Sequence, residues 1–137
     1  MISLKDIEYV LLDMDGTLLD KYFDDYFWEH LVPDKYAEKH HLSFGKAKEE
    51  LMSRYRAHEG TLNWTDIDFW SHELKLDIPA LKEQIRHLID VHPNAVAFLR
   101  ALRQHKKKVY MVTNAHYKVL DMKLPISVFF SFMSRTL

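Results

Sequence analysis

The sequence has no cysteine and only three glycines among its 137 residues. Without a thiol the chain forms no disulfides or thiolate zinc sites and has no cysteine nucleophile. The scarcity of glycine favours a largely helical chain. The net charge of -1 gives no electrostatic footprint for nucleic acid or an anionic membrane, and no apolar run approaches the roughly 18 residues of a membrane span. We therefore expect a soluble, cytoplasmic protein whose partners include neither a nucleic acid polymer nor a membrane.

A short apolar run near the N-terminus ends abruptly in two acids. Tyr9 to Leu12 are apolar without alternation, which predicts a strand covered on both faces, as in parallel α/β sheets. If the extended conformation persists, the carboxylates of Asp13 and Asp15 project to the same side, and Gly16 then lets the chain turn. Open α/β sheets bind ligands at this end of their strands, and Mg²⁺ prefers carboxylates with phosphate oxygens. The alternative is a plain acidic turn that ends the strand.

A second strand is predicted far along the chain. Val109 to Val112 form another apolar run, tipped by Thr113 and Asn114. Pro93 begins a helix before it, with a buried stripe at Val96, Phe98, Leu99 and Leu102. Strand, helix and strand together predict a right-handed parallel crossover. Beyond it, a short helix from His116 to Leu124 and a third strand from Ser127 to Met133 are expected.

Between these strands the chain reads as helices. A helix is expected to begin at each of four positions: Pro33, Ser43, Thr65 and Pro79. The helix that starts at Ser43 should continue to Arg56. Thr65 is expected to cap its helix together with Asp68. Several aromatic residues lie in this region, and they either form its own hydrophobic core or stack on a purine: Tyr22, Phe23, Trp28, Trp64 and Trp70.

Two motifs resemble those of a known enzyme family. Asp13-Met-Asp15-Gly16-Thr17 resembles the first motif of the haloacid dehalogenase-like (HAD) hydrolases, and the segment 109–114 resembles their second. The segments 23–28, 60–70 and 113–116 look like the bacterial GMP/IMP nucleotidase branch of that family. The resemblance implies an α/β fold, in which residues 1–17 and 91–137 form a partial Rossmann-like core with a parallel sheet. Residues 18–90 would then form an all-helical cap inserted after the first strand.

The resemblance also implies a reaction and roles for particular residues. Asp13 is the expected nucleophile, which forms an aspartyl-phosphate, and Asp15 is the expected general acid and base. Mg²⁺ is expected at Asp13 and Asp15. Thr113 and Asn114 are expected to hold the phosphoryl group and the mouth of the site, and His116 to touch the substrate. The implied substrate is a small phosphomonoester, a purine 5′-mononucleotide such as GMP or IMP.

The family's third motif, with its lysine, and its fourth, with its metal-binding acids, have no match in this chain. Lys118 and Lys123 are candidate stand-ins for the lysine, but both are expected on the exposed face of the short helix. Without a fourth strand the first strand becomes an open apolar edge, which predicts a homodimer. Two other functions therefore stay open: a catalytically impaired remnant or interaction module, and a phosphotransferase or sugar-phosphate mutase.

Overall fold

The computed structural model describes residues 3–126 and 131–136. The chain divides into two compact units, which are described separately. The sheet unit comprises Met1–Lys21, Ile89–Asn114 and Lys123–Leu137. The helical unit comprises Tyr22–Leu88 and Ala115–Met122. None of the described helices combines the length and the apolar character that a membrane-spanning segment needs.

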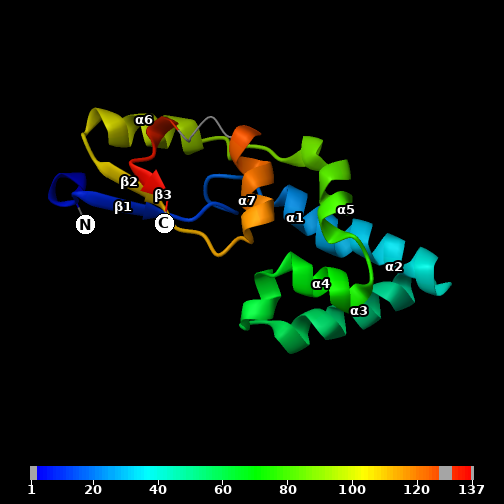
Figure 1. The fold of residues 1–137 in the computed structure, drawn as a ribbon. Helices are drawn as coiled ribbons and strands as arrows, with labels where there is room; N and C mark the ends of the chain where they lie inside the picture. The colour runs from blue at the N-terminus through cyan, green and yellow to red at the C-terminus, as the bar shows by residue number, and fades with distance from the viewer. Residues whose placement is uncertain (1–2, 127–130, 137) are drawn as a thin grey trace. The chain divides into compact units, whose positions relative to one another are not determined.

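The sheet unit is built on three parallel strands in the order β1-β2-β3 (Figure 1). They are β1 (Tyr9–Leu12), β2 (Lys108–Met111) and β3 (Arg135–Thr136). The register pairs Tyr9 with Lys108 and Leu12 with Met111, so the carboxyl ends of β1 and β2 lie side by side at the same end of the sheet. The prediction of two parallel strands is confirmed, with β2 shifted by one residue.

The prediction that β1 is covered on both faces is wrong. Tyr9 and Leu11 are 53% and 63% exposed, whereas Val109 and Met111 of β2 are buried. Successive residues of a strand point to opposite faces, so Val10, Val109 and Met111 share one face and Leu11 lies on the other. Helix α6 (Ala95–Gln104) packs against β2 and covers one face of the sheet (Figure 1). β1 is an edge strand, because β2 is its one partner among the described residues.

The helix before β2 confirms its prediction in part. Leu99 and Leu102 of α6 are fully buried, but Phe98 is 44% exposed. Helical geometry separates positions 98 and 99 by about 100°, so only one of them points into the core. The buried stripe therefore runs through Ala95, Leu99 and Leu102.

The prediction of a third strand is wrong for the part of its range that the structure describes. Of the expected stretch 127–133, residues 127–130 lie outside the described residues, and 131–133 are not in a strand. β3 comes later, at Arg135–Thr136. Apolar composition alone predicted a strand here, but among the described residues the strand pairing with β2 begins at Arg135, opposite Tyr110.

The segments through which the chain first leaves the sheet unit and first returns to it are paired with each other. An antiparallel bridge joins Leu19 to Val91. The Asp20 N–H donates to the Asp90 carbonyl at 2.9 Å, and the His92 N–H donates to the Leu18 carbonyl at 2.8 Å. The sequence between these residues contributes most of the helical unit.

The helical unit contains five α-helices besides α7 among the described residues. Its helices, with α7, are α1 (Tyr22–Tyr26), the π-helix η2 (Phe27–Leu31), α2 (Val32–His40), α3 (Phe44–His58), α4 (Ile67–Leu74), α5 (Ile78–Gln84) and α7 (Tyr117–Lys123). Short 3₁₀ turns η3 (Leu62–Thr65) and η4 (Arg86–Leu88) join them, and the sheet unit adds η1 (Leu4–Asp6) and η5 (Leu124–Ile126). Lys123, the last residue of α7, belongs to the sheet unit.

Capping hydrogen bonds in the structure test two of the predicted helix starts. The Ser43 hydroxyl accepts a hydrogen bond from the Lys46 N–H at 3.3 Å, which confirms Ser43 as the cap of α3. Thr65 is not the cap of α4. Asp66 takes that place, because its carboxylate accepts from the N–H groups of Asp68 and Phe69. Both residue types cap helices well, so the sequence pattern alone did not separate neighbouring candidates.

Aromatic side chains form much of the core of the helical unit. Phe23 and Trp70 are almost fully buried. Trp70 meets the rings of Trp28 and Tyr55 edge to face, with centroid distances of 6.1 and 5.2 Å. Edge-to-face pairs of this kind add to the stabilisation from burial. Tyr22 and Trp64, by contrast, are 56% and 41% exposed, so they lie outside this core.

Candidate active site

The loop that follows β1 is held by its own backbone. The chain bends at Met14, so the extended conformation expected through Asp13 and Asp15 does not persist. Met14 is fully buried, and its carbonyl accepts from the N–H groups of Leu18 and Leu19, both at 2.9 Å. Gly16 has a φ of +77°, a left-handed conformation that residues with a Cβ rarely adopt. The sequence prediction that Gly16 turns the chain is confirmed.

The two acids of this loop differ in their surroundings. Asp13 is exposed, and its Oδ1 accepts from the Met14 N–H at 2.7 Å. The Asp15 side chain is 31% exposed, and its Oδ1 accepts from Lys123 Nζ at 2.6 Å. An oxygen of each carboxylate is thus oriented by a hydrogen bond. Asp15 in addition has an ammonium ion against it, which stabilises its ionised form.

Lys123 does not lie on the exposed face of the short helix. Its side chain is 1% exposed, so that expectation is wrong. The physical reason is the ion pair with Asp15, a residue 108 positions earlier. Lys118, on the same helix, is 39% exposed and pairs with Asp68 at 2.6 Å. The two candidate stand-ins for a catalytic lysine therefore have different partners, and only Lys123 contacts an acid of the loop after β1.

Thr113 and Asn114 follow β2 at the carboxyl end of the sheet, where Asp13 follows β1. The Val112 N–H donates to the Leu12 carbonyl at 2.8 Å, which continues the parallel pairing one step beyond β2. The chain that carries Thr113 therefore leaves the sheet beside the chain that carries Asp13. Thr113 is half-buried and Asn114 is exposed.

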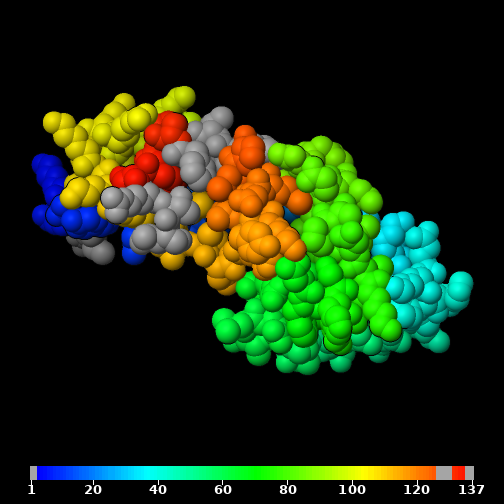
Figure 2. Space-filling view, in the orientation of Figure 1, coloured from blue at the N-terminus to red at the C-terminus, as the bar shows by residue number. Residues whose placement is uncertain are grey.

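His116 belongs to the helical unit and contacts two acids there. Its Nε2 lies 3.6 Å from Asp66 Oδ1 and 3.5 Å from Asp68 Oδ2. Its Nδ1 accepts from the Lys118 N–H at 3.3 Å. In Figure 2 the orange atoms of α7 lie directly against the green atoms of the neighbouring segment that includes α4. The sequence missed this cluster, because the residues that form it come from segments about fifty positions apart.

Asp66, Asp68 and His116 have potential metal-ligating atoms within 4.8 Å of one another. The charges around them favour an ion-pair cluster instead. Lys118 already neutralises Asp68, and the hydrogen bond from its ammonium is the main cause that lowers the pKa of that carboxyl. Because Nδ1 of the imidazole is an acceptor, a neutral ring carries its proton on Nε2, the atom that faces the acids. A proton at that position leaves no lone pair there for a metal.

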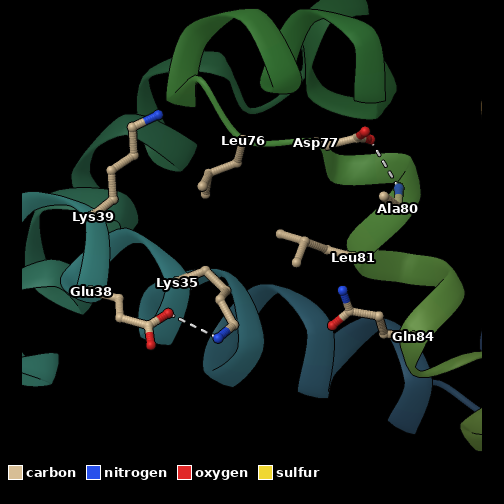
Figure 3. Close-up of a pocket in the computed structure, with 8 residues that line it drawn as sticks. All are labelled: Lys35, Glu38, Lys39, Leu76, Asp77, Ala80, Leu81 and Gln84. Carbon is tan, nitrogen blue, oxygen red and sulfur yellow. Dashed lines mark hydrogen bonds and ion pairs between the residues drawn. The ribbon is translucent and has the colours of Figure 1, made fainter.

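A cleft of about 450 Å³ opens between α2 and α5 in the helical unit (Figure 3). Apolar side chains of Leu76 and Leu81 form part of its wall, and an ion pair of Lys35 with Glu38 lies on the α2 side. None of the sequence-predicted site residues lines it. Its full lining is Lys35, Glu38, Lys39, Leu76, Asp77, Ala80, Leu81 and Gln84.

The parallel sheet, the acidic loop after β1 and the polar turn after β2 define a hydrolase of the HAD-like class. The family model described as haloacid dehalogenase-like hydrolase matches residues 7–133, and the chain belongs to this family. GMP/IMP nucleotidase YrfG of Escherichia coli (strain K12) is 40% identical over 123 residues, which are 90% of this chain and 55% of that protein. The protein of the same name from Shigella flexneri matches to the same extent.

Solved structures agree with this assignment. A HAD phosphatase from Thermococcus onnurineus superposes with a TM-score of 0.80 at 26% identity, covering 96% of this chain and 61% of that one. The L-2-haloacid dehalogenase RSc1362 shares the fold, with a TM-score of 0.58 at 20% identity, covering 96% and 63%. The chain thus spans only a little over half the length of the relatives that it matches.

Proposed function

We propose that this chain carries the nucleophile-bearing part of a phosphohydrolase that cleaves a small phosphomonoester. The observation that carries the proposal is the loop after β1, with Asp13 exposed at the end of the strand and Asp15 two residues on. Unaided hydrolysis of phosphate monoesters is among the slowest biological reactions. A catalyst therefore needs a positioned nucleophile and groups that neutralise the phosphoryl charge.

The donor set at this loop fits Mg²⁺. Asp13 offers carboxylate oxygens and Asp15 its main-chain carbonyl, hard oxygen ligands of the kind that Mg²⁺ takes together with phosphate oxygens and water. Asp13 is exposed, and its hydrogen bond with the Met14 N–H engages Oδ1, so we propose Oδ2 as the metal ligand. When bound, the ion would neutralise phosphoryl charge. The bond-forming and proton-transfer steps are carried out by side chains of the protein.

Asp13 attacks phosphorus with a carboxylate oxygen, and the bond from phosphorus to the ester oxygen breaks. The product is an aspartyl-phosphate on Asp13. Its hydrogen bond with the Met14 N–H holds the carboxylate at the strand end, which fixes the direction of attack. Water then attacks the phosphoryl group and releases inorganic phosphate and the free carboxylate.

Asp15 transfers the protons. In the first step it donates a proton to the leaving ester oxygen, and in the second it takes one from the attacking water. The Lys123 ammonium at 2.6 Å favours the ionised form of Asp15, which is the form required in the second step. The first step requires a protonated Asp15, so the negative charge of the arriving phosphate must offset that ammonium.

Thr113, Asn114 and His116 bind the substrate in this proposal. The Thr113 hydroxyl donates to a phosphoryl oxygen, and the Asn114 amide lines the mouth of the site. His116 contacts the rest of the substrate, with its ring oriented by Asp66 and Asp68. In this proposal the helical unit is the cap that the sequence resemblance implies.

The relative's name supports a substrate class. A GMP/IMP nucleotidase is 40% identical to this chain, so we propose a purine 5′-mononucleotide with a 6-oxo group as the substrate. Trp64, an exposed aromatic side chain of the helical unit, is the proposed stacking partner of the base. A homodimer through the β1 edge and a cytoplasmic location stay predictions.

The test is release of inorganic phosphate from GMP, IMP and AMP, with and without Mg²⁺, by the wild type, Asp13→Asn and Asp6→Asn. Asp6 is an exposed acid of the same unit, so its variant controls for a lost charge. We expect Mg²⁺-dependent release from GMP and IMP that Asp13→Asn abolishes and Asp6→Asn retains. No release above the Asp13→Asn background from folded protein would refute the proposal and favour the impaired remnant. Transfer of phosphate to an added alcohol instead of water would favour the phosphotransferase.

A further inference from the structure

Lys123 is a buried charge whose role in the proposed site extends beyond favouring the ionised form of Asp15. Lys82 and Lys123 are the two charged residues that are buried among those described, and Lys82 lies in the helical unit. Removing an ammonium ion from water costs several kcal/mol unless a partner compensates. Packing alone does not require a charged group there, because a methionine fills a similar volume. The position of Lys123 therefore calls for a partner that gains from its charge.

That partner is Asp15. The Nζ–Oδ1 distance of 2.6 Å is short even for a charge-assisted hydrogen bond. Asp15 is 31% exposed, whereas the lysine is 1% exposed, so the pair presents its carboxylate to solvent and its ammonium to the interior. The ion pair therefore lies at the boundary between the interior and the accessible side of the loop.

The source of Lys123 in the chain makes the contact specific. Residues 115–137 contain two lysines, and the other, Lys118, is paired with Asp68 in the helical unit. Lys123 closes α7, where the helix dipole also favours a cation. A lysine anchored at a helix end has fewer conformations to lose than one on a free loop.

We propose that Lys123 is a positioning residue of the site at Asp13 and Asp15. Its ammonium fixes the rotamer of Asp15. Its positive charge also repels a divalent cation that binds at the two acids, and so weakens cation binding there. The inference rests on the proposed function of this loop. It adds orientation of Asp15 and control of cation affinity to the charge stabilisation that the last residue of α7 supplies.

Such a residue has an effect that a purely structural lysine lacks. Removing its charge takes away repulsion of the cation, so Mg²⁺ binds more tightly. The same change frees the Asp15 carboxylate to rotate, so turnover falls. A structural lysine, by contrast, would on removal weaken cation binding and turnover together, because the loop as a whole would lose order.

The test is calorimetric titration of Mg²⁺ into the wild type, Lys123→Met, Lys123→Arg and Lys118→Met. Lys118→Met is the matched control, because it removes an ion pair of the same 2.6 Å length from the same helix. We expect Lys123→Met to bind Mg²⁺ about tenfold more tightly and the other two variants to bind like the wild type. In the phosphate-release assay we expect kcat of Lys123→Met to fall about 100-fold with little change in KM, and Lys123→Arg to recover part of it.

Unchanged or weaker Mg²⁺ binding by folded Lys123→Met would overturn the inference, and so would absence of binding in both it and the wild type. A second measurement uses the unmodified chain and so covers a variant that fails to fold. The ¹⁵Nζ resonance of Lys123 should shift on addition of Mg²⁺ while that of Lys118 stays in place. No shift at saturating Mg²⁺ would also overturn it. Failure of the proposed function is seen separately, as wild type that binds Mg²⁺ with Lys123 responding but releases no phosphate.

Discussion

The three glycines of the chain form a series that tests how the loop after β1 is built. Gly16 and Gly60 both have a φ of +77°, and Gly45 lies near the start of α3 without a positive φ. A Cβ at Gly60 or Gly45 would meet nothing within 4 Å, whereas one at Gly16 would lie 3.0 Å from Cγ of Lys21. Alanine at each position therefore separates backbone strain from close contact and from helix propensity.

The magnitudes follow from the backbone. A left-handed conformation costs alanine about 1–2 kcal/mol, and the loss of unfolded-state freedom offsets roughly 0.4–1 kcal/mol of that. We expect Gly16→Ala and Gly60→Ala each to lower local stability by about 1 kcal/mol. Gly16→Ala should cost slightly more, since the flexible Lys21 side chain must move. Gly45→Ala should instead stabilise α3 by about 0.5–1 kcal/mol.

Native-state hydrogen exchange reads these changes in each unit separately. Amides of β2 should lose protection in Gly16→Ala, whereas amides of α3 should lose it in Gly60→Ala and gain it in Gly45→Ala. Phosphate release should fall about 100-fold only in Gly16→Ala, because a misplaced Asp15 loses its alignment. Equal protection in Gly16→Ala and the wild type, or full activity in that variant, would refute the assigned role of the turn.

Three further predictions concern the helical unit. Tyr55→Phe should raise the unfolding midpoint and stabilise by about 1 kcal/mol, because the buried Tyr55 hydroxyl has no hydrogen-bond partner among the described residues; a lower midpoint would contradict this. Lys82→Ala should destabilise by about 3 kcal/mol in urea unfolding, since it both breaks the 3.0 Å ion pair with Asp24 and removes the buried stem of the side chain. Lys82→Met breaks the same ion pair but keeps the packing, so it should cost less than half as much, and equal losses would contradict this reasoning. Lys118→Met should raise the Asp68 pKa toward its ordinary value of 3.8, as followed by carboxyl NMR. The pair stabilises above that pH and its contribution is lost as the pH falls through the lowered pKa, so an unchanged Asp68 titration would contradict it.

Local signals in the sequence predicted the local structure. The length and limits of the two apolar runs predicted those of β1 and β2 to within one residue. Ser43 lies one residue before the helix that it caps. Gly16 likewise sits at a position where the backbone itself requires it. Such features depend on neighbours within a few positions, so the sequence pattern contains them.

Features that depend on distant contacts were missed or misjudged. Exposure of Leu11 depends on what covers the second face of the sheet, and burial of Lys123 depends on a carboxylate 108 positions away. The cluster of His116 with Asp66 and Asp68 is of the same kind. Helical spacing predicted exposed lysines on α7, but an ion pair overrode it for Lys123 alone.

The central claim is that Asp13 accepts the phosphoryl group. Its most direct test is rapid quenching of the wild type during turnover of GMP with Mg²⁺, followed by mass spectrometry of the peptide that spans β1 and its loop. The claim predicts a phosphoryl group on Asp13 that is absent from Asp13→Asn and accumulates in Asp15→Asn, where water attack is slowed. Phosphate release without any adduct on Asp13, or an adduct on another residue, would contradict it.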